Sequence, residues 1–230
     1  MPQVKLILIV VVLLFGWRMA SKVGGGELRY LALGDSYTIG ESVAAEERYP
    51  MQVRRLLAEK DHLSCGEPEI IAVTGWTTGN LLEALPQDRE EGGSGSVYDV
   101  VSLLIGVNNQ FQGRSQVEYR EQFELLLNKC ILLAGNRPGR VVVLSVPDYS
   151  VTPFGREGDT ALISSQIDSF NSINAELSRK YAVKYVDVTA ESRKALVDPS
   201  LIAGDGLHFS GKEYGIWARL MEPAIREALR

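Results

Sequence analysis

The sequence predicts an α/β fold in which helices cover both faces of a parallel sheet. Five short apolar runs, most of them rich in β-branched residues, alternate with stretches in which apolar residues recur at helical spacing. The runs are continuously apolar rather than alternating, which is typical of strands buried on both faces. A chain of 230 residues with 45% apolar content is long enough for one domain with a complete core. We therefore expect a three-layer α/β/α sandwich around a five-stranded parallel sheet.

The predicted elements follow one another from Leu28 to the end of the chain. Strands are expected at 28–33, 69–73, 98–105, 140–146 and 183–188, and helical spacing is clearest at 114–134, 160–181 and 211–229. The last helix begins with a capping box formed by Ser210 and Glu213, and Phe209 is placed to pack on Tyr214. The Gly- and Ser-rich stretch 92–96 is expected to be a surface loop.

The first 26 residues are set apart from this pattern. Residues 6–17 form an apolar run between Lys5 and Arg18, too short for an ordinary bilayer-spanning helix but of the length of a signal-peptide core. A cleaved export signal and an uncleaved anchor that associates with a membrane through residues 4–17 are equally good interpretations. Three glycines then form a flexible linker, so we expect one folded domain at 27–230. Both interpretations predict an exported or membrane-anchored protein rather than a cytoplasmic one.

The composition narrows the classes of partner and ligand. The net charge is −5 without a basic block, which argues against nucleic-acid binding. The two cysteines, Cys65 and Cys130, lack metal-ligand spacing, so no structural metal site is expected. They form either one disulfide or two buried thiols. A monomer is the default expectation.

Reactive and turn-forming residues follow each predicted strand. Because the carboxyl ends of parallel strands lie along one edge of a sheet, these residues should converge there. Ser36 follows the first strand, Gly75 the second and Asn108 the third. Asp148 follows the fourth strand and is interpreted as a loop residue, and His208 precedes the last helix. The sequence therefore predicts a functional site at this edge.

The residue types suit acyl transfer. A serine hydroxyl is a weak nucleophile that needs a base, and His208 is the histidine at the edge, whereas His62 is interpreted as a solvated or helix-capping residue. Asp205, three residues before His208, can hold the second ring nitrogen. Backbone N–H groups of Ser36 and Gly75 and the amide of Asn108 can form an oxyanion hole.

At these residues the chain resembles the SGNH (GDSL-type) hydrolases. The resemblance rests on Gly34-Asp35-Ser36, on Gly75 in TGWTTGNL, on Asn108 in LIGVNNQ and on Asp205-Gly-Leu-His208. It implies a flavodoxin-like sheet order 2-1-3-4-5 and a serine esterase without metal or organic cofactor. It also implies Ser36 as nucleophile, His208 as base, Asp205 as orienting acid, and an oxyanion hole of Ser36, Gly75 and Asn108.

Two features of the chain stand beside this resemblance. In the family the third motif usually reads Gly-x-Asn-Asp, whereas here Asn109 occupies the last position. We expect Asn109 to support its loop by hydrogen bonding, as an Asp would. The stretch 147–155, PDYSVTPFG, resembles a loop of some bacterial members and is expected to help line the substrate site.

The sequence leaves the substrate and the acceptor open. A small-molecule or carbohydrate ester with a short acyl chain, such as an acetylated sugar, suits the site best. An acyltransferase would use the same residues and deliver the acyl group to an alcohol. A non-catalytic flavodoxin-like binding module is the third alternative, although the chain has no Gly-rich phosphate motif.

Overall fold

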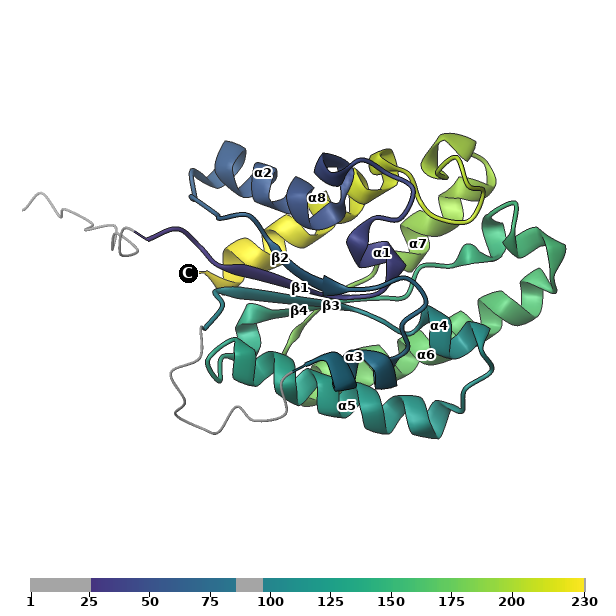
Figure 1. The fold of residues 1–230 in the computed structure, drawn as a ribbon, viewed down its shortest axis with the longest axis horizontal. Helices are drawn as coiled ribbons and strands as arrows, with labels where there is room; N and C mark the ends of the chain where they lie inside the picture. Colours follow the sequence, from purple (N-terminus) through teal and green to yellow (C-terminus); the bar gives the residue numbers. More distant parts are fainter. Residues whose placement is uncertain (1–25, 86–96, 230) are drawn as a thin grey trace, which may run out of the picture.

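The computed structural model describes residues 26–85 and 97–229, which form three layers (Figure 1). The central sheet is parallel with strand order β2-β1-β3-β4-β5. The strands are β1 (Tyr30–Gly34), β2 (Glu69–Ala72), β3 (Val100–Leu104), β4 (Val141–Leu144) and β5 (Lys184–Val186). The predicted fold class and sheet order are confirmed, and each strand is shorter than its apolar run.

Helices cover both faces of the sheet. On one face α2 (Tyr49–Asp61) packs on α8 (Gly211–Ala228); on the other lie α3 (Thr78–Ala84), α5 (Gln116–Leu133) and α6 (Thr160–Lys180) (Figure 1). Three short helices, α1 (Ser36–Ile39), α4 (Val107–Phe111) and α7 (Thr189–Ser192), follow β1, β3 and β5. The 3₁₀ turns are η1 (Ala45–Glu47), η2 (Pro138–Arg140), η3 (Tyr149–Val151), η4 (Gly155–Glu157), η5 (Arg193–Leu196) and η6 (Pro199–Leu201).

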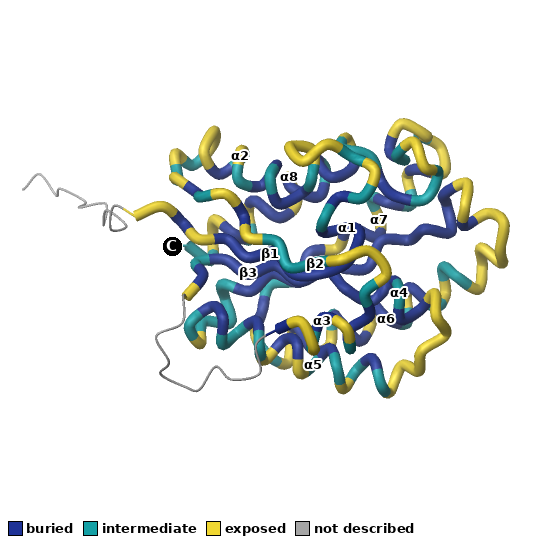
Figure 2. The backbone as a smooth tube through the Cα atoms, in the orientation of Figure 1, coloured by how far each residue is buried: buried dark blue, intermediate teal, exposed yellow. Residues whose placement is uncertain are grey.

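The central strands β1, β3 and β4 are buried on both faces, the edge strands β2 and β5 are partly exposed, and each face has its own core. Figure 2 shows the sheet as the buried centre of the molecule, with exposure along the outer sides of the helices. Under α8 the ring of Trp217 contacts those of Tyr49 and Tyr214. On the other face Phe123 and Phe170 pack around Tyr119. The continuous apolar runs of the sequence are therefore explained by two-sided burial.

The start of α8 differs in part from its prediction. Ser210 caps the helix by accepting a hydrogen bond from the Glu213 N–H. The Glu213 side chain, however, does not complete a capping box. It accepts a hydrogen bond of 2.7 Å from Trp217 Nε1 and is fully buried. The indole N–H inside the core needs an acceptor, and a carboxylate one turn earlier supplies it.

A steric requirement fixes the end of β1. Gly34 pairs with Leu104 of β3, and a Cβ at Gly34 would lie 2.1 Å from Thr38 Oγ1 and 2.2 Å from the Leu104 carbonyl oxygen. No side chain fits there. The chain therefore turns directly from β1 into α1.

Several predictions fall on the termini and loops. The apolar run 6–17, the glycine linker through Gly25 and the loop 92–96 lie outside the described residues. No helix within 26–85 and 97–229 is long and apolar enough to cross a membrane.

Cys65 and Cys130 are both free and buried. Burial raises the pKa of the Cys65 thiol to about 11 and that of Cys130 to about 12.

Replacement of Gly34 by Ala should destabilise the protein. Overpacking against a backbone carbonyl costs about 1–3 kcal/mol or more, because the neighbouring strand cannot move aside. Gly139→Ala is the matched control, since a Cβ at Gly139 meets no atom within 4 Å. Urea unfolding should show a lower midpoint for Gly34→Ala and an unchanged midpoint for Gly139→Ala. Equal midpoints would contradict the steric argument.

The stability of the protein should depend on the ionisation of Glu213. Burial raises the pKa of Glu213 to about 7, against the opposing hydrogen bond from Trp217. A pKa raised on folding gives stability that is complete below the unfolded pKa, about 4.3, and is lost as pH rises through 7.

Glu213→Gln keeps an oxygen for Trp217 and removes this ionisation. We expect the variant to equal the wild type near pH 4 and to exceed its unfolding free energy by about 1–3 kcal/mol at pH 8. Denaturant unfolding at the two pH values measures the difference. A constant difference between the proteins at all pH values would refute the assignment.

Candidate active site

Ser36 is the first residue of α1 and lies at the carboxyl edge of the sheet, where β1 ends (Figure 1). Asp35 precedes it as the helix N-cap, and its Oδ1 accepts a hydrogen bond of 3.1 Å from the Tyr37 N–H. This cap fixes the first turn, so Ser36 has a defined orientation. Gly40 ends the helix with φ of 65°, in the left-handed region.

Asp35 is a buried acid whose bond to the helix N-terminus is structural. It is 1% exposed, and its Oδ2 has no hydrogen-bond partner among the described residues. Burial raises the pKa of Asp35 to about 7, although the Tyr37 N–H opposes the rise. The sequence-based interpretation of Asp35 as a turn-stabilising residue agrees with its capping bond.

A hairpin-like loop presents Asp205 and His208. Its two arms are joined by hydrogen bonds from Ala203 N to the His208 carbonyl and from Ser210 N to the Leu201 carbonyl, both 2.8 Å. At the tip, Asp205 Oδ1 accepts from the N–H groups of Leu207 and His208, each at 2.9 Å. Such an Asx turn explains locally why an Asp begins this motif.

The Asp205 carboxylate also holds the imidazole of His208. Asp205 Oδ2 lies 2.6 Å from His208 Nδ1, and it accepts a second hydrogen bond of 2.6 Å from Ser42 Oγ. Partial burial tends to raise the pKa of Asp205, but the hydrogen bonds from Ser42, His208 and the loop N–H groups outweigh it and hold this pKa well below its usual range. The Asp205 carboxylate is therefore negatively charged at neutral pH and can stabilise a positive charge on the His208 ring.

Aromatic packing supports the other side of His208. The imidazole is 10% exposed, and its centroid lies 5.8 Å from that of Tyr37 in an edge-on arrangement. Tyr37 in turn contacts Phe209 and Trp217 of the core under α8. The imidazole is thus held by a carboxylate at Nδ1 and by packing against the buried ring of Tyr37.

Gly75 and Asn108 line the same cleft as His208. Gly75 has φ of 83° and open space around its Cα, so glycine is required there by the backbone conformation rather than by crowding. Its N–H makes no hydrogen bond with the described part of the chain. Asn108 donates from Nδ2 to the Trp76 carbonyl at 2.9 Å. An amide has two N–H groups, which leaves one for a ligand.

Asn109 fixes the spacing between these two loops. Its Oδ1 accepts from the Thr78 N–H at 3.0 Å, and its Nδ2 donates to Thr78 Oγ1 at 2.8 Å. Thr78 Oγ1 donates onward to Gln122 Oε1. Asn109 is fully buried and supports the start of α3. Its side chain therefore supports a loop by hydrogen bonding, as we expected. An Asn can both donate and accept here, and it carries no buried charge.

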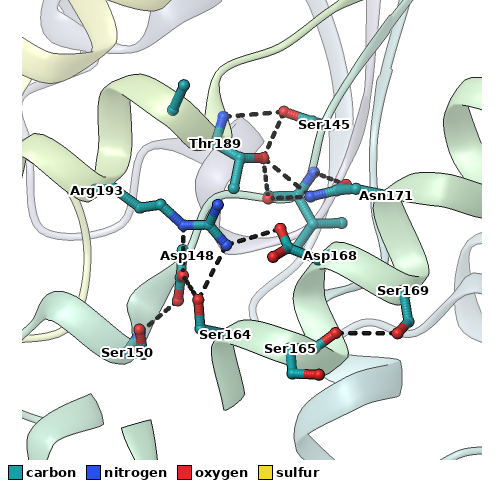
Figure 3. Close-up of polar contacts among 12 residues, drawn as sticks. Ser145, Asp148, Ser150, Ser164, Ser165, Asp168, Ser169, Asn171, Thr189 and Arg193 are labelled. Carbon is teal, nitrogen blue, oxygen red and sulfur yellow. Dashed lines mark hydrogen bonds and ion pairs between the residues drawn. The ribbon is translucent and has the colours of Figure 1, made fainter. Parts of the chain in front are cut away.

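Asp148 has a larger role than the loop residue that the sequence suggested. It is fully buried and accepts from Ser150 N, Ser164 Oγ and Arg193 Nε, with the last bond at 2.9 Å (Figure 3). Burial opposes its ionisation, but these hydrogen bonds lower its pKa. Arg193 also pairs with Asp168 at 2.7 Å.

This network anchors the segment 147–155 over the site. Phe154 N donates to the Gly206 carbonyl at 3.0 Å, which joins the segment to the Asp205–His208 loop. Tyr149 and Phe154 line the same cleft as Ser36. The expectation that 147–155 helps to line the site therefore agrees with the structure.

One cleft of about 140 Å³ brings most of the predicted site residues together. Ser36, Gly75, Asn108 and His208 are all in its wall, and Asp205 lies behind His208. The remaining walls are mostly apolar or aromatic: Tyr37, Val107, Phe111, Tyr149, Phe154 and Leu207. A serine hydroxyl, a histidine bonded to a carboxylate, and potential N–H donors at Gly75 and Asn108 thus lie together at one cleft, an arrangement suited to acyl transfer.

Sequence reasoning missed the contributions of Ser42 and Phe111. Ser42 contacts Asp205 from a loop 163 residues away in sequence, and Phe111 contacts Phe154 with ring centroids 6.0 Å apart. No local motif marks either residue. The described residues contain no cluster of three or more His, Cys, Asp and Glu side chains that could hold a metal ion.

Loss of the Asn109 side chain should weaken both the fold and the site. Asn109→Ala leaves the Thr78 N–H without its acceptor, which costs about 1–3 kcal/mol of unfolding free energy. The turnover of a substrate should fall as well, because α3 starts directly after the Gly75 loop. Asn128→Ala is the control, since Asn128 is exposed and bonds only within its helix. Equal stability of the two variants would contradict the claim that the Asn109 side chain stabilises the site.

Comparisons with known proteins identify the family and the fold. Residues 32–216 match the GDSL-like lipase/acylhydrolase family. No curated protein sequence matches the chain.

Three solved structures illustrate the similarity of fold. A lipase from a goat rumen metagenome is 19% identical, with 86% of this chain and 97% of that chain covered and a TM-score of 0.68. The lipase/acylhydrolase from Enterococcus faecalis is 22% identical, with 88% and 98% covered and a TM-score of 0.63. An acetylxylan esterase from Geobacillus stearothermophilus is 22% identical, with 89% and 96% covered and a TM-score of 0.60. Since the family match spans most of the described residues, the chain belongs to the GDSL-like lipase/acylhydrolase family.

Proposed function

We propose that the protein is a serine esterase that cleaves carboxylic esters through an acyl-enzyme intermediate. The observation that carries this proposal is that His208, joined to Asp205 at 2.6 Å, lines the same cleft as Ser36. Membership of a lipase/acylhydrolase family supports hydrolysis of an ester. The assignment of roles to individual residues rests on their geometry.

The first half of the reaction acylates Ser36. Nε2 of His208 removes the hydroxyl proton while Ser36 Oγ attacks the ester carbonyl. Asp205, bonded to Nδ1, fixes the tautomer and stabilises the imidazolium. The oxyanion accepts hydrogen bonds from the N–H groups of Ser36 and Gly75 and from the Asn108 amide. The imidazolium then gives its proton to the departing alcohol, and the acyl group stays on Ser36.

The second half returns the enzyme to its starting state. Water gives a proton to His208 and attacks the acyl carbonyl. The same three donors stabilise the second oxyanion. The proton returns to Ser36 Oγ as the acid leaves. No further cofactor is needed for either half.

The size and lining of the cleft favour a short acyl chain. About 140 Å³ is well below the roughly 300–1,000 Å³ of pockets that enclose drug-sized ligands. Val107, Tyr149 and Leu207 give it apolar walls. At the mouth, Phe111 is 58% exposed and Phe154 is 40% exposed. Their rings offer an apolar surface to the alcohol part of a substrate, including the C–H face of a sugar.

An acetylated carbohydrate outside the cytoplasm fits these features. The acetylxylan esterase of similar fold is, according to its name, an enzyme that acts on an acetylated carbohydrate. The apolar run 6–17 supports export or membrane anchoring, which would place the enzyme with extracytoplasmic substrates.

Hydrolysis of p-nitrophenyl esters by the full chain tests the proposal. We expect the fastest turnover for acetyl to butyryl esters and a loss of at least about 10³-fold in kcat for Ser36→Ala. Ser169→Ala is the control, because the hydroxyl of this partly exposed residue bonds only within α6. Undiminished hydrolysis by Ser36→Ala would disprove the nucleophile. An added alcohol that becomes acylated in preference to water would identify an acyltransferase instead.

A further inference from the structure

The Asp205 carboxylate receives more hydrogen bonds than its own loop supplies. Two donors come from the Asx turn and one from His208 Nδ1, all within four residues of Asp205. The fourth donor, Ser42 Oγ, belongs to the loop after α1. It bonds Oδ2, the same oxygen that holds the imidazole, and both distances are 2.6 Å.

The backbone of Ser42 is held in an unusual conformation to reach this position. Its φ is 64°, in the left-handed region that disfavours residues with a Cβ. Gly40 already ends α1 in that region, so Ser42 is not needed to cap the helix. A left-handed residue without a capping role is a reason to ask what its side chain does.

The residue before Ser42 ties the same loop to the opposite wall of the cleft. Glu41 N donates to the Ser36 carbonyl at 2.9 Å, and Glu41 Oε2 accepts from Thr74 Oγ1 at 2.5 Å. Thr74 is the neighbour of Gly75 in the chain. Residues 40–43 therefore connect the nucleophile, the Gly75 loop and Asp205.

We propose that Ser42 is a positioning residue whose hydroxyl holds the Asp205 carboxylate in the orientation that binds His208 Nδ1. This inference rests on the proposed esterase function. The Asp205 side chain is 31% exposed, so water can compete for Oδ2 and the carboxylate can rotate. A fixed donor on Oδ2 keeps that oxygen toward the imidazole. Ser42 is not among the residues that line the cleft, so its effect passes through Asp205.

Two substitutions separate the hydroxyl from the fold. Ser42→Gly removes the hydroxyl and also the left-handed strain, so the protein should be as stable as the wild type or more stable. Ser42→Thr keeps a hydroxyl but adds a branched Cβ at positive φ, so it should be less stable. A positioning role predicts a slow, stable Gly variant and a faster, less stable Thr variant. A purely structural role predicts the reverse order of rates.

The expected loss for Ser42→Gly is about tenfold in kcat with KM within about twofold, because a carboxylate free to rotate stabilises the imidazolium of the transition state less well. Ala182→Gly is the matched control. Ala182 has φ of 54° and follows α6, so this variant should gain stability without a change in rate. In an Asp205→Asn background, the further change Ser42→Gly should have little effect, since their shared bond is already altered.

Reaction of the full chain with a fluorophosphonate probe gives a readout that does not depend on finding the substrate. The rate of covalent labelling of Ser36 should fall about tenfold in Ser42→Gly and be restored at least partly in Ser42→Thr. Wild-type labelling rates in Ser42→Gly would overturn the role of Ser42 and leave the esterase proposal intact. A wild-type protein that neither hydrolyses esters nor reacts with the probe would overturn both.

Discussion

The close approach of β1 to β3 at Gly34 is the constraint on which the site depends. The space beside Gly34 is filled by the Leu104 carbonyl and the Thr38 hydroxyl, so the strand ends without a side chain there. The chain then enters the short helix α1, which is capped by Asp35 and begins with Ser36. Ser36, the first residue of this helix, therefore follows the carboxyl end of β1 closely. The other site residues gather around this fixed point because parallel strands end on the same side.

Buried polar bonds hold the two walls of the cleft at their separation. On one side, Asn109 and Thr78 join the loops that carry Asn108 and Gly75. On the other side, the buried Asp148 and its partner Arg193 anchor the segment that carries Tyr149. Removal of one member of such a pair leaves a desolvated donor or acceptor, so these bonds tolerate few alternatives. The cleft is therefore preorganised by hydrogen bonding as well as by apolar packing.

The Asp205–His208 pair combines a rigid ring with a partly exposed acid. His208 is packed against Tyr37, whereas Asp205 reaches toward solvent and depends on its hydrogen bonds for orientation. In a hydrolase, the carboxylate must stay bonded to the imidazole while charge develops on the ring. The local Asx turn satisfies one oxygen of Asp205. The second oxygen is governed by His208 and by the distant loop at Ser42.

The sequence by itself determined the layers of the fold and the order of the motifs along the chain. Apolar runs separated by helical spacing indicate a parallel sheet covered on both faces. The motifs at Ser36, Gly75 and His208 also meet local backbone needs: a helix cap, a positive φ and an Asx turn. The tertiary structure decided the hydrogen-bond partners of individual side chains in the core and around the site. The side chain of Glu213 bonds Trp217 instead of capping its helix, because an indole N–H buried in the core needs an acceptor. Asp148 and Ser42 meet their partners across 45 and 163 residues of sequence. Such contacts depend on how the loops pack in space, and no periodicity or spacing in the sequence encodes them.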